Sequence, residues 1–191
     1  MDEVKFTNAV LYLLQHAPGR PGLMHLLKML FLVDYEHYRR YLSPVTGAQY
    51  VALPDGPVID DYKRRFDQLL RQGVLDVQEA PVPGRQNKKV EYLPRLEADP
   101  RVFKASELAV MGAVVRQHGA ATGVGLSQKT HLQGPWSLAW DPERQGQPIP
   151  YMLFRWHDNL PDQEDIEAAR QSIYDRRLES RIAALNGQPS T

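Results

Sequence analysis

The chain has 191 residues, of which 42% are apolar and 24% are charged, so it is long enough for one domain with a hydrophobic core. Its 23 lysines and arginines balance its 23 aspartates and glutamates, and this zero net charge argues against a protein whose main partner is bulk nucleic acid. The sequence has no cysteine, which excludes disulfides, thiolate metal sites and a thiol nucleophile.

The first two predicted elements are helices. Residues 3–16 carry regularly spaced apolar side chains and are followed by the breaker APGRPG. The acidic start of the chain and the lack of a cleavage pattern favour a helix over a signal peptide, so we expect a cytoplasmic protein. The second helix follows the breaker, buries one face and ends before Ser43-Pro44. Its most apolar part is interrupted by His25 and Lys28 and is too short to cross a membrane, so no membrane partner is expected.

The middle of the chain alternates between extended and helical patterns. Residues 50–53 are strand formers, and the prolines and glycine of the following PDGPV allow no helix before about residue 58. A third helix is predicted over 58–72, with Gly73 at its C-terminal cap. Alternating segments on either side of the turn-rich PVPGRQNKK predict a β-hairpin over 74–95.

The rest of the chain is predicted to be helix and loop. Ser106 is the expected N-cap of a helix that runs to about His118, and a shorter helix is expected around 122–132. Residues 141–150 are predicted to be loop, and a last helix is predicted over 162–185, where acidic residues precede arginines as the helix macrodipole favours. The predicted fold class is α+β and mainly α-helical, with a helical core, a short extended segment and one antiparallel β-hairpin in a winged-helix-like order.

The stretch LFLVDYEHYRRY, residues 30–41, places a carboxylate in the predicted core. Asp34 continues the apolar stripe of Leu30, where an unpaired buried carboxylate is very costly. We therefore expect it either to lie at the solvent-exposed edge of the stripe or to accept hydrogen bonds from the TGAQYV segment, from the Thr46 hydroxyl or from His131. A general base would need a nucleophile or a substrate pocket nearby, and the sequence shows no candidate for either.

A metal site at Asp34 and His37 is another interpretation, because the two residues lie three positions apart on one helical face. A complete site needs three or four ligands, and the chain has no HxxxH or HExxH spacing. A hydrogen-bonded or exposed histidine is the simpler interpretation. No metal and no cofactor is expected.

Cationic side chains support an alternative function. They lie on the predicted third helix and at the hairpin tip: Lys63, Arg64, Arg65, Arg71, Arg85, Lys88 and Lys89. A recognition helix with a basic wing, as in a winged-helix DNA-binding transcriptional regulator, has this pattern. Asp60, Asp61 and Asp67 interleave with the cations of the helix, which favours a mixed solvated surface instead.

Two blocks of the sequence carry a family resemblance. The first block, residues 26–58, closely resembles the signature of the Panacea domain and reads LLKMLFLVDYEHYRRYLSPVTGAQYVALPDGPV. Panacea domains are found in the SocA-like antitoxins of bacterial and phage toxin–antitoxin systems. Residues 126–136 are similar to the family's second block, LS-x-x-(S/T)H-x-x-x-PW. Asp55 departs from the pattern, since many members have an aromatic residue before GPV. The motif residues expected to be structural are Asp34, Tyr35, His37, Thr46, Gly47, Tyr50, Gly56, Pro57, His131, Pro135 and Trp136.

The resemblance implies a function. It implies an antitoxin without enzymatic activity that neutralises a toxin encoded beside it by direct protein–protein binding. Residues 1–140 would form the Panacea domain, and residues 141–191 a C-terminal loop and helix packed on it, with no separate DNA-binding domain. The expected partner is the cognate toxin.

The toxin interface is expected outside the signature. A fold that neutralises many toxins is expected to use its variable surface. This places the interface at the hairpin tip (83–89), the loop 141–150 and the helix 162–185. The candidate interface residues are Arg85, Lys88, Lys89, Ile166, Ile173 and Arg177.

Overall fold

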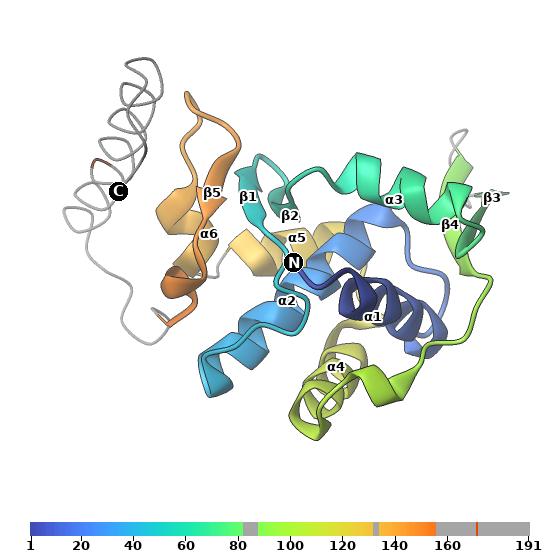
Figure 1. Ribbon diagram of the computed structural model, residues 1–191. Coiled ribbons are helices and arrows are strands. Elements are labelled where there is room, and N and C mark those ends of the chain that lie inside the picture. The colour runs from blue at the N-terminus through green and yellow to red at the C-terminus, as the bar shows by residue number, and fades with distance from the viewer. Residues whose placement is uncertain (82–87, 132–133, 156–170, 172–191) are drawn as a thin grey trace, which may run out of the picture.

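The computed structural model describes residues 1–81, 88–131, 134–155 and 171, which form a mainly helical α+β fold (Figure 1). The α-helices are α1 (Glu3–His16), α2 (Leu23–Tyr41), α3 (Tyr62–Arg71), α4 (Ala105–His118), α5 (Gly123–His131) and α6 (Gly134–Ala139). The strands are β1 (Tyr50–Leu53), β2 (Gly56–Ile59), β3 (Leu75–Pro81), β4 (Lys88–Pro94) and β5 (Gln147–Ile149). Two 3-10 helices are η1 (Pro100–Val102) and η2 (Tyr151–Arg155). The predicted fold class is confirmed.

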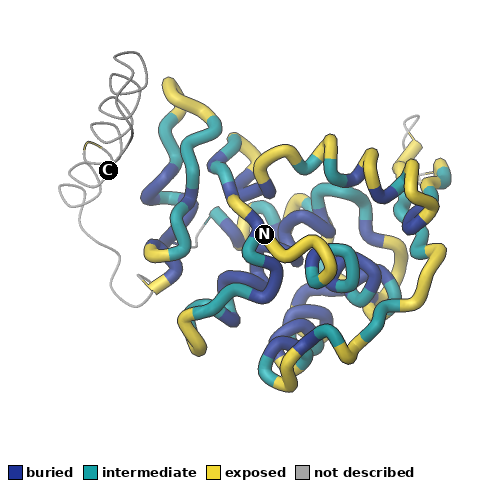
Figure 2. The backbone as a smooth tube through the Cα atoms, in the orientation of Figure 1, coloured by how far each residue is buried: buried dark blue, intermediate teal, exposed yellow. Residues whose placement is uncertain are grey.

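Helix α2 is the centre of the core. It contacts α1, α4, α5, β2 and η2, and most of its length is dark blue in Figure 2, the colour of buried residues. Every residue from His25 to Tyr35 is buried, so the helix is covered on all sides rather than on the single face that its apolar spacing predicted. A helix surrounded in this way has to accommodate its polar side chains inside the core.

Helices α1 and α4 are joined by a partly buried ion pair and begin at specific caps. Lys5 Nζ lies 2.6 Å from Glu107 Oε1, and the Glu107 side chain also accepts a hydrogen bond from the Lys104 backbone N–H at 2.7 Å. The prediction that Ser106 caps α4 is therefore wrong, because Lys104 occupies the N-cap position and Glu107 closes the first turn. At the start of α1, the Asp2 side chain accepts from the Lys5 backbone N–H.

The larger sheet corrects two predictions. Its strand order is β2-β1-β5 and both pairings are antiparallel. The third helix does not begin at 58, because Gly56–Ile59 pair with β1 as a strand and α3 starts at Tyr62. The segment 141–150 is not all loop, since Gln147–Ile149 pair with β1 as β5. Short segments such as these become strands only because β1 supplies backbone partners.

The predicted hairpin is confirmed as β3 and β4, whose register runs from Leu75 opposite Pro94 to Pro81 opposite Lys88. Gly73, with φ of +70°, ends the turn after α3 as expected. The order helix, strand, helix, hairpin is present, but the hairpin is a separate two-stranded sheet and does not pair with β1. The elements thus follow the chain order of a winged helix, but the hairpin strands β3 and β4 do not pair with β1.

The short helix expected around 122–132 is confirmed as α5. Within the described residues, no helix is long and apolar enough to cross a membrane. Apart from Gln171, the helix predicted over 162–185 lies outside the described residues.

Candidate functional site

A fully buried carboxylate joins three segments of the core. Asp34 Oδ1 accepts hydrogen bonds from the backbone N–H groups of Val45 at 2.8 Å and Thr46 at 2.7 Å. Its Oδ2 accepts from the hydroxyls of Thr46 at 2.5 Å, Tyr50 at 2.8 Å and Tyr151 at 3.0 Å. These contacts connect α2 to the segment that enters β1 and to η2.

The Asp34 cluster has its hydrogen-bonding capacity filled. Two carboxylate oxygens offer about four lone-pair sites, and five donor groups lie within hydrogen-bond distance of them, although the Tyr50 and Tyr151 hydroxyls also reach the Leu30 and Ala48 carbonyls. Burial raises the pKa of Asp34 above its ordinary value, while the hydrogen bonds from Thr46, Tyr50 and Tyr151 oppose that change. Burial and the neighbouring carboxylate raise the pKa of Tyr50. No acceptor site remains for a substrate proton, so the arrangement is suited to holding segments together.

Sequence reasoning found part of this cluster. The donors expected from the TGAQYV segment contact Asp34, whereas His131 lies in a different cluster, stacked on Trp136. Tyr151 was missed, because nothing local in the sequence marks it. Its hydroxyl, which also donates to the Ala48 carbonyl at 2.6 Å, reaches Asp34 only because β5 pairs with β1 and positions η2.

A second buried cluster surrounds Gly56. Lys28 Nζ is completely buried and donates to the Pro57 carbonyl at 2.8 Å. A Cβ placed on Gly56 would lie 2.9 Å from Lys28 Nζ and 3.0 Å from His131 Nε2, so both nitrogens face this glycine. Gly56 has φ of +100°, a conformation that side-chain-bearing residues rarely adopt. The chain thus needs glycine at 56 for two separate reasons.

The electrostatics of this cluster are unusual. Burial lowers the pKa of Lys28 to about 7, although the charge of Asp55 acts in the opposite direction. Burial also lowers the pKa of His131, whose Nε2 is buried and has no hydrogen-bond partner among the described residues. Sequence reasoning used Lys28 only to exclude a membrane segment, yet a lysine inside the most apolar stretch of the chain was the signal for this cluster.

The second sequence block closes over the Gly56 cluster. Trp136 Nε1 donates to the Leu53 carbonyl at 3.0 Å, and its ring stacks on His131 with centroids 4.1 Å apart. Ser127 Oγ donates to the Asp55 carbonyl. Position 55, where the sequence departs from the family pattern, thus contacts the second block through its backbone. Pro135 is buried in α6 beside Trp136.

The remaining motif residues are also structural in their contacts. Tyr35 is buried and stacks on Phe31 with ring centroids 5.8 Å apart. The ring nitrogens of His37 contact the Ser43 carbonyl at 2.5 Å and Ser106 Oγ at 3.1 Å, away from Asp34. Gly47 has φ of +67° in the turn that delivers Thr46. Among the described residues, no group of three or more His, Asp or Glu side chains could hold a metal ion.

Several of the cations considered for DNA binding form ion pairs with acidic groups. On α3, Arg64 pairs with Asp61 at 3.2 Å and Arg65 pairs with Glu3 at 3.1 Å. On the hairpin, Lys88 pairs with Glu79 at 2.7 Å. These pairs lower the positive potential that phosphate contacts require.

The candidate interface residues are only partly visible. Lys88 and Lys89 are exposed on β4, and Lys89 Nζ donates to the Arg20 carbonyl at 2.5 Å. Arg85, Ile166, Ile173 and Arg177 lie outside the described residues.

The sequence matches the model of a known protein family. Residues 26–137, more than half of the chain, match the family described as antitoxin SocA-like, Panacea domain. The chain belongs to this family. The matched region of the Panacea domain contains every residue of the two buried clusters except Tyr151. Tyr151 lies beyond the matched region, together with β5 and η2. No curated protein and no solved structure matches the chain.

Proposed function

We propose that this protein is a cytoplasmic antitoxin that neutralises a co-encoded toxin by binding it directly, without catalysis. The observation that carries the proposal is the Panacea-domain match over 26–137. Many residues of the family signature lie in two polar clusters inside the core, among them Asp34, Thr46 and His131, which suits a scaffold whose surface does the binding. In this proposal residues 1–140 form the antitoxin domain and residues 141–191 are packed on it.

We further propose that the exposed end of the hairpin, with Arg85, Lys88 and Lys89, belongs to the toxin interface. Lys88 and Lys89 are exposed and lie outside both polar clusters, so substitutions there change the surface without disturbing the core. Ile166, Ile173 and Arg177 are proposed members of the same interface on the basis of sequence alone.

Co-expression with the product of the adjacent reading frame tests the proposal. Full-length protein is expected to restore growth to cells that express the neighbouring product and to elute with it as one complex in size-exclusion chromatography. Persistent toxicity at full expression, with the two proteins eluting separately, would contradict the proposal. Sequence-specific retardation of operon DNA by this chain alone, with steep salt dependence, would favour the DNA-binding alternative.

A further inference from the structure

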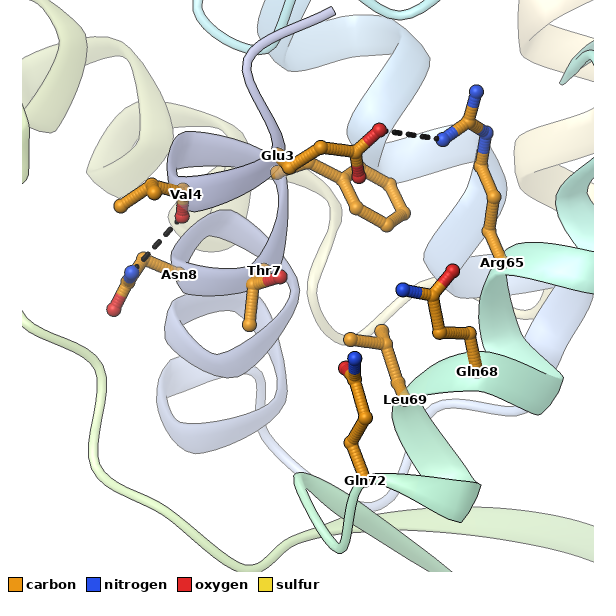
Figure 3. Close-up of a pocket in the computed structure, with 9 residues that line it drawn as sticks. Glu3, Val4, Thr7, Asn8, Arg65, Gln68, Leu69 and Gln72 are labelled. Atoms are coloured by element: carbon orange, nitrogen blue, oxygen red, sulfur yellow. Dashed lines mark hydrogen bonds and ion pairs between the residues drawn. The ribbon is translucent and has the colours of Figure 1, made fainter.

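An open groove of about 340 Å³ separates α1 from α3 (Figure 3). Buried Phe6 from α1 and Leu69 from α3 contribute apolar surface to its lining. Phe6 packs edge-on against Phe66, with ring centroids 6.4 Å apart, which fixes the two helices at this depth. The groove therefore has an apolar base, and the contact between Phe6 and Phe66 holds its two helices together.

The walls of the groove carry unused hydrogen-bonding groups. Figure 3 shows Thr7 on α1 facing Gln68, which projects from α3, and Gln72, which projects from the C-cap of α3. The Thr7 hydroxyl and the two side-chain amides make no hydrogen bond with any described residue. Each glutamine amide offers donors and acceptors together, which is the complement of a peptide main chain.

The charges that line the groove offset each other. Glu3 pairs with Arg65 at 3.1 Å at one end, as the dashed line in Figure 3 shows. The other lining residues are uncharged: Val4, Phe6, Thr7, Asn8, Gln68, Leu69 and Gln72. An occupant with its own net charge would gain no opposite charge here and would lose hydration, so the groove is complementary to an uncharged segment.

We propose that this groove docks an extended, uncharged segment of the toxin, a proposal that rests on the antitoxin function and deepens it. Gln68 and Gln72 are one helical turn apart, a rise of about 6 Å. Main-chain groups on one side of an extended peptide repeat every two residues, or about 6.7 Å. The two amides can therefore bond to successive main-chain groups, while an apolar side chain of the segment contacts Phe6 and Leu69.

The position of the groove agrees with this role. Helix α3 lies inside the family match and α1 lies before it, so the groove combines an element of the signature with one outside it. The groove also adjoins the hairpin, since α3 contacts β3 and α1 contacts β4. One toxin could thus contact the groove and the hairpin together.

The test uses the full chain and the product of the adjacent reading frame. The groove variant is Gln68→Ala with Gln72→Ala, and its matched control is Gln49→Ala with Gln117→Ala, two exposed glutamines elsewhere on the surface. A third variant, Thr7→Trp, fills the groove. The groove variants are expected to weaken the complex by about 10- to 100-fold, corresponding to two lost hydrogen bonds, while the control binds as the wild type does. All variants are expected to keep the wild-type melting temperature.

The outcomes separate the two proposals. Wild-type protein that binds no product of the adjacent frame overturns the antitoxin function and the groove proposal with it. Wild-type binding that is unchanged in both groove variants overturns the groove proposal alone. A photo-reactive amino acid at Val4 should cross-link to one toxin segment with few charged residues. Cross-linking to a strongly charged segment, or to a second copy of this chain, would overturn the proposed occupant.

Discussion

The Gly56 and Asp34 clusters and the α1–α3 groove use polar side chains in opposite ways. Asp34 is fully buried and all its acceptor sites are used, and Lys28 is fully buried against a backbone carbonyl. In the groove, the amides of Gln68 and Gln72 are exposed and make no hydrogen bond with a described residue. Buried polar groups with fixed partners specify how segments meet, whereas exposed groups with free capacity are available to another molecule.

The comparison predicts that substitutions in the two regions change different measured quantities. Changes in the buried clusters should lower the free energy of unfolding, because donors or charges lose their partners inside the core. Changes in the groove or on the hairpin should alter binding and leave unfolding almost unchanged. Four substitutions test this contrast, beginning with the largest expected effect.

The substitution Asp34→Ala should have the largest effect on stability. It leaves the backbone N–H groups of Val45 and Thr46 and the Thr46 hydroxyl without their acceptor, while the hydroxyls of Tyr50 and Tyr151 keep only the Leu30 and Ala48 carbonyls. We expect a loss of roughly 3–5 kcal/mol in the free energy of unfolding, measured by urea denaturation. Asp67→Ala, at an exposed position on α3, is the control. A variant of wild-type stability would show that Asp34 does not hold these segments together.

The substitution Gly56→Ala should be the next most damaging. An alanine at this position would have to adopt φ of +100°, and its Cβ would lie 2.9 Å from Lys28 Nζ. We expect a loss of about 2–4 kcal/mol. Gly146→Ala is a matched control, because Gly146 also has positive φ, +79°, but has open space around it. Equal losses in the two variants would mean that backbone strain alone, and not the Lys28–His131 cluster, requires glycine at 56.

The buried lysine should make stability depend on pH. The pKa of Lys28 is about 7 in the folded protein and about 10.5 in the unfolded chain, so between these values the unfolded chain binds more protons. Stability should therefore rise with pH, by about 2 kcal/mol between pH 7 and pH 9, and Lys28→Met should remove this rise. The comparison is the free energy of unfolding of both proteins across that range, with the exposed Lys63→Met as control. If the free energy of unfolding rose equally with pH in the wild type and in Lys28→Met, the pH dependence would not come from Lys28.

The smallest stability effect is expected on the hairpin. Lys88 pairs with Glu79 at 2.7 Å, but both side chains are more than half exposed. Lys88→Ala should change the free energy of unfolding by less than about 0.5 kcal/mol. If the hairpin belongs to the toxin interface, the same variant should bind the toxin more weakly in a titration. A large loss of stability without any loss of binding would place Lys88 with the scaffold instead.

Local sequence patterns determined much of this fold. The spacing of apolar residues was sufficient to predict α1, α2 and the β3–β4 hairpin, because periodicity and turn residues act over a few positions. The position of Asp34 on an apolar stripe predicted that a buried carboxylate here needs donors, and the TGAQYV segment, one of the expected sources, supplies them. These features depend on neighbours in the sequence or on the cost of burying a charge, and both can be judged without coordinates.

The tertiary structure decided what depends on distant partners. Gly56–Ile59 and Gln147–Ile149 are too short to form strands alone and do so because β1 lies between them. The same pairing carries Tyr151 to Asp34, and the packing of α5 and α6 against β2 and β1 brings His131 and Trp136 to Gly56 and Leu53. The α1–α3 groove also belongs to this class, since its walls come from helices separated by about 45 residues of chain. Contacts between remote segments depend on the balance of the whole core, which no local pattern records.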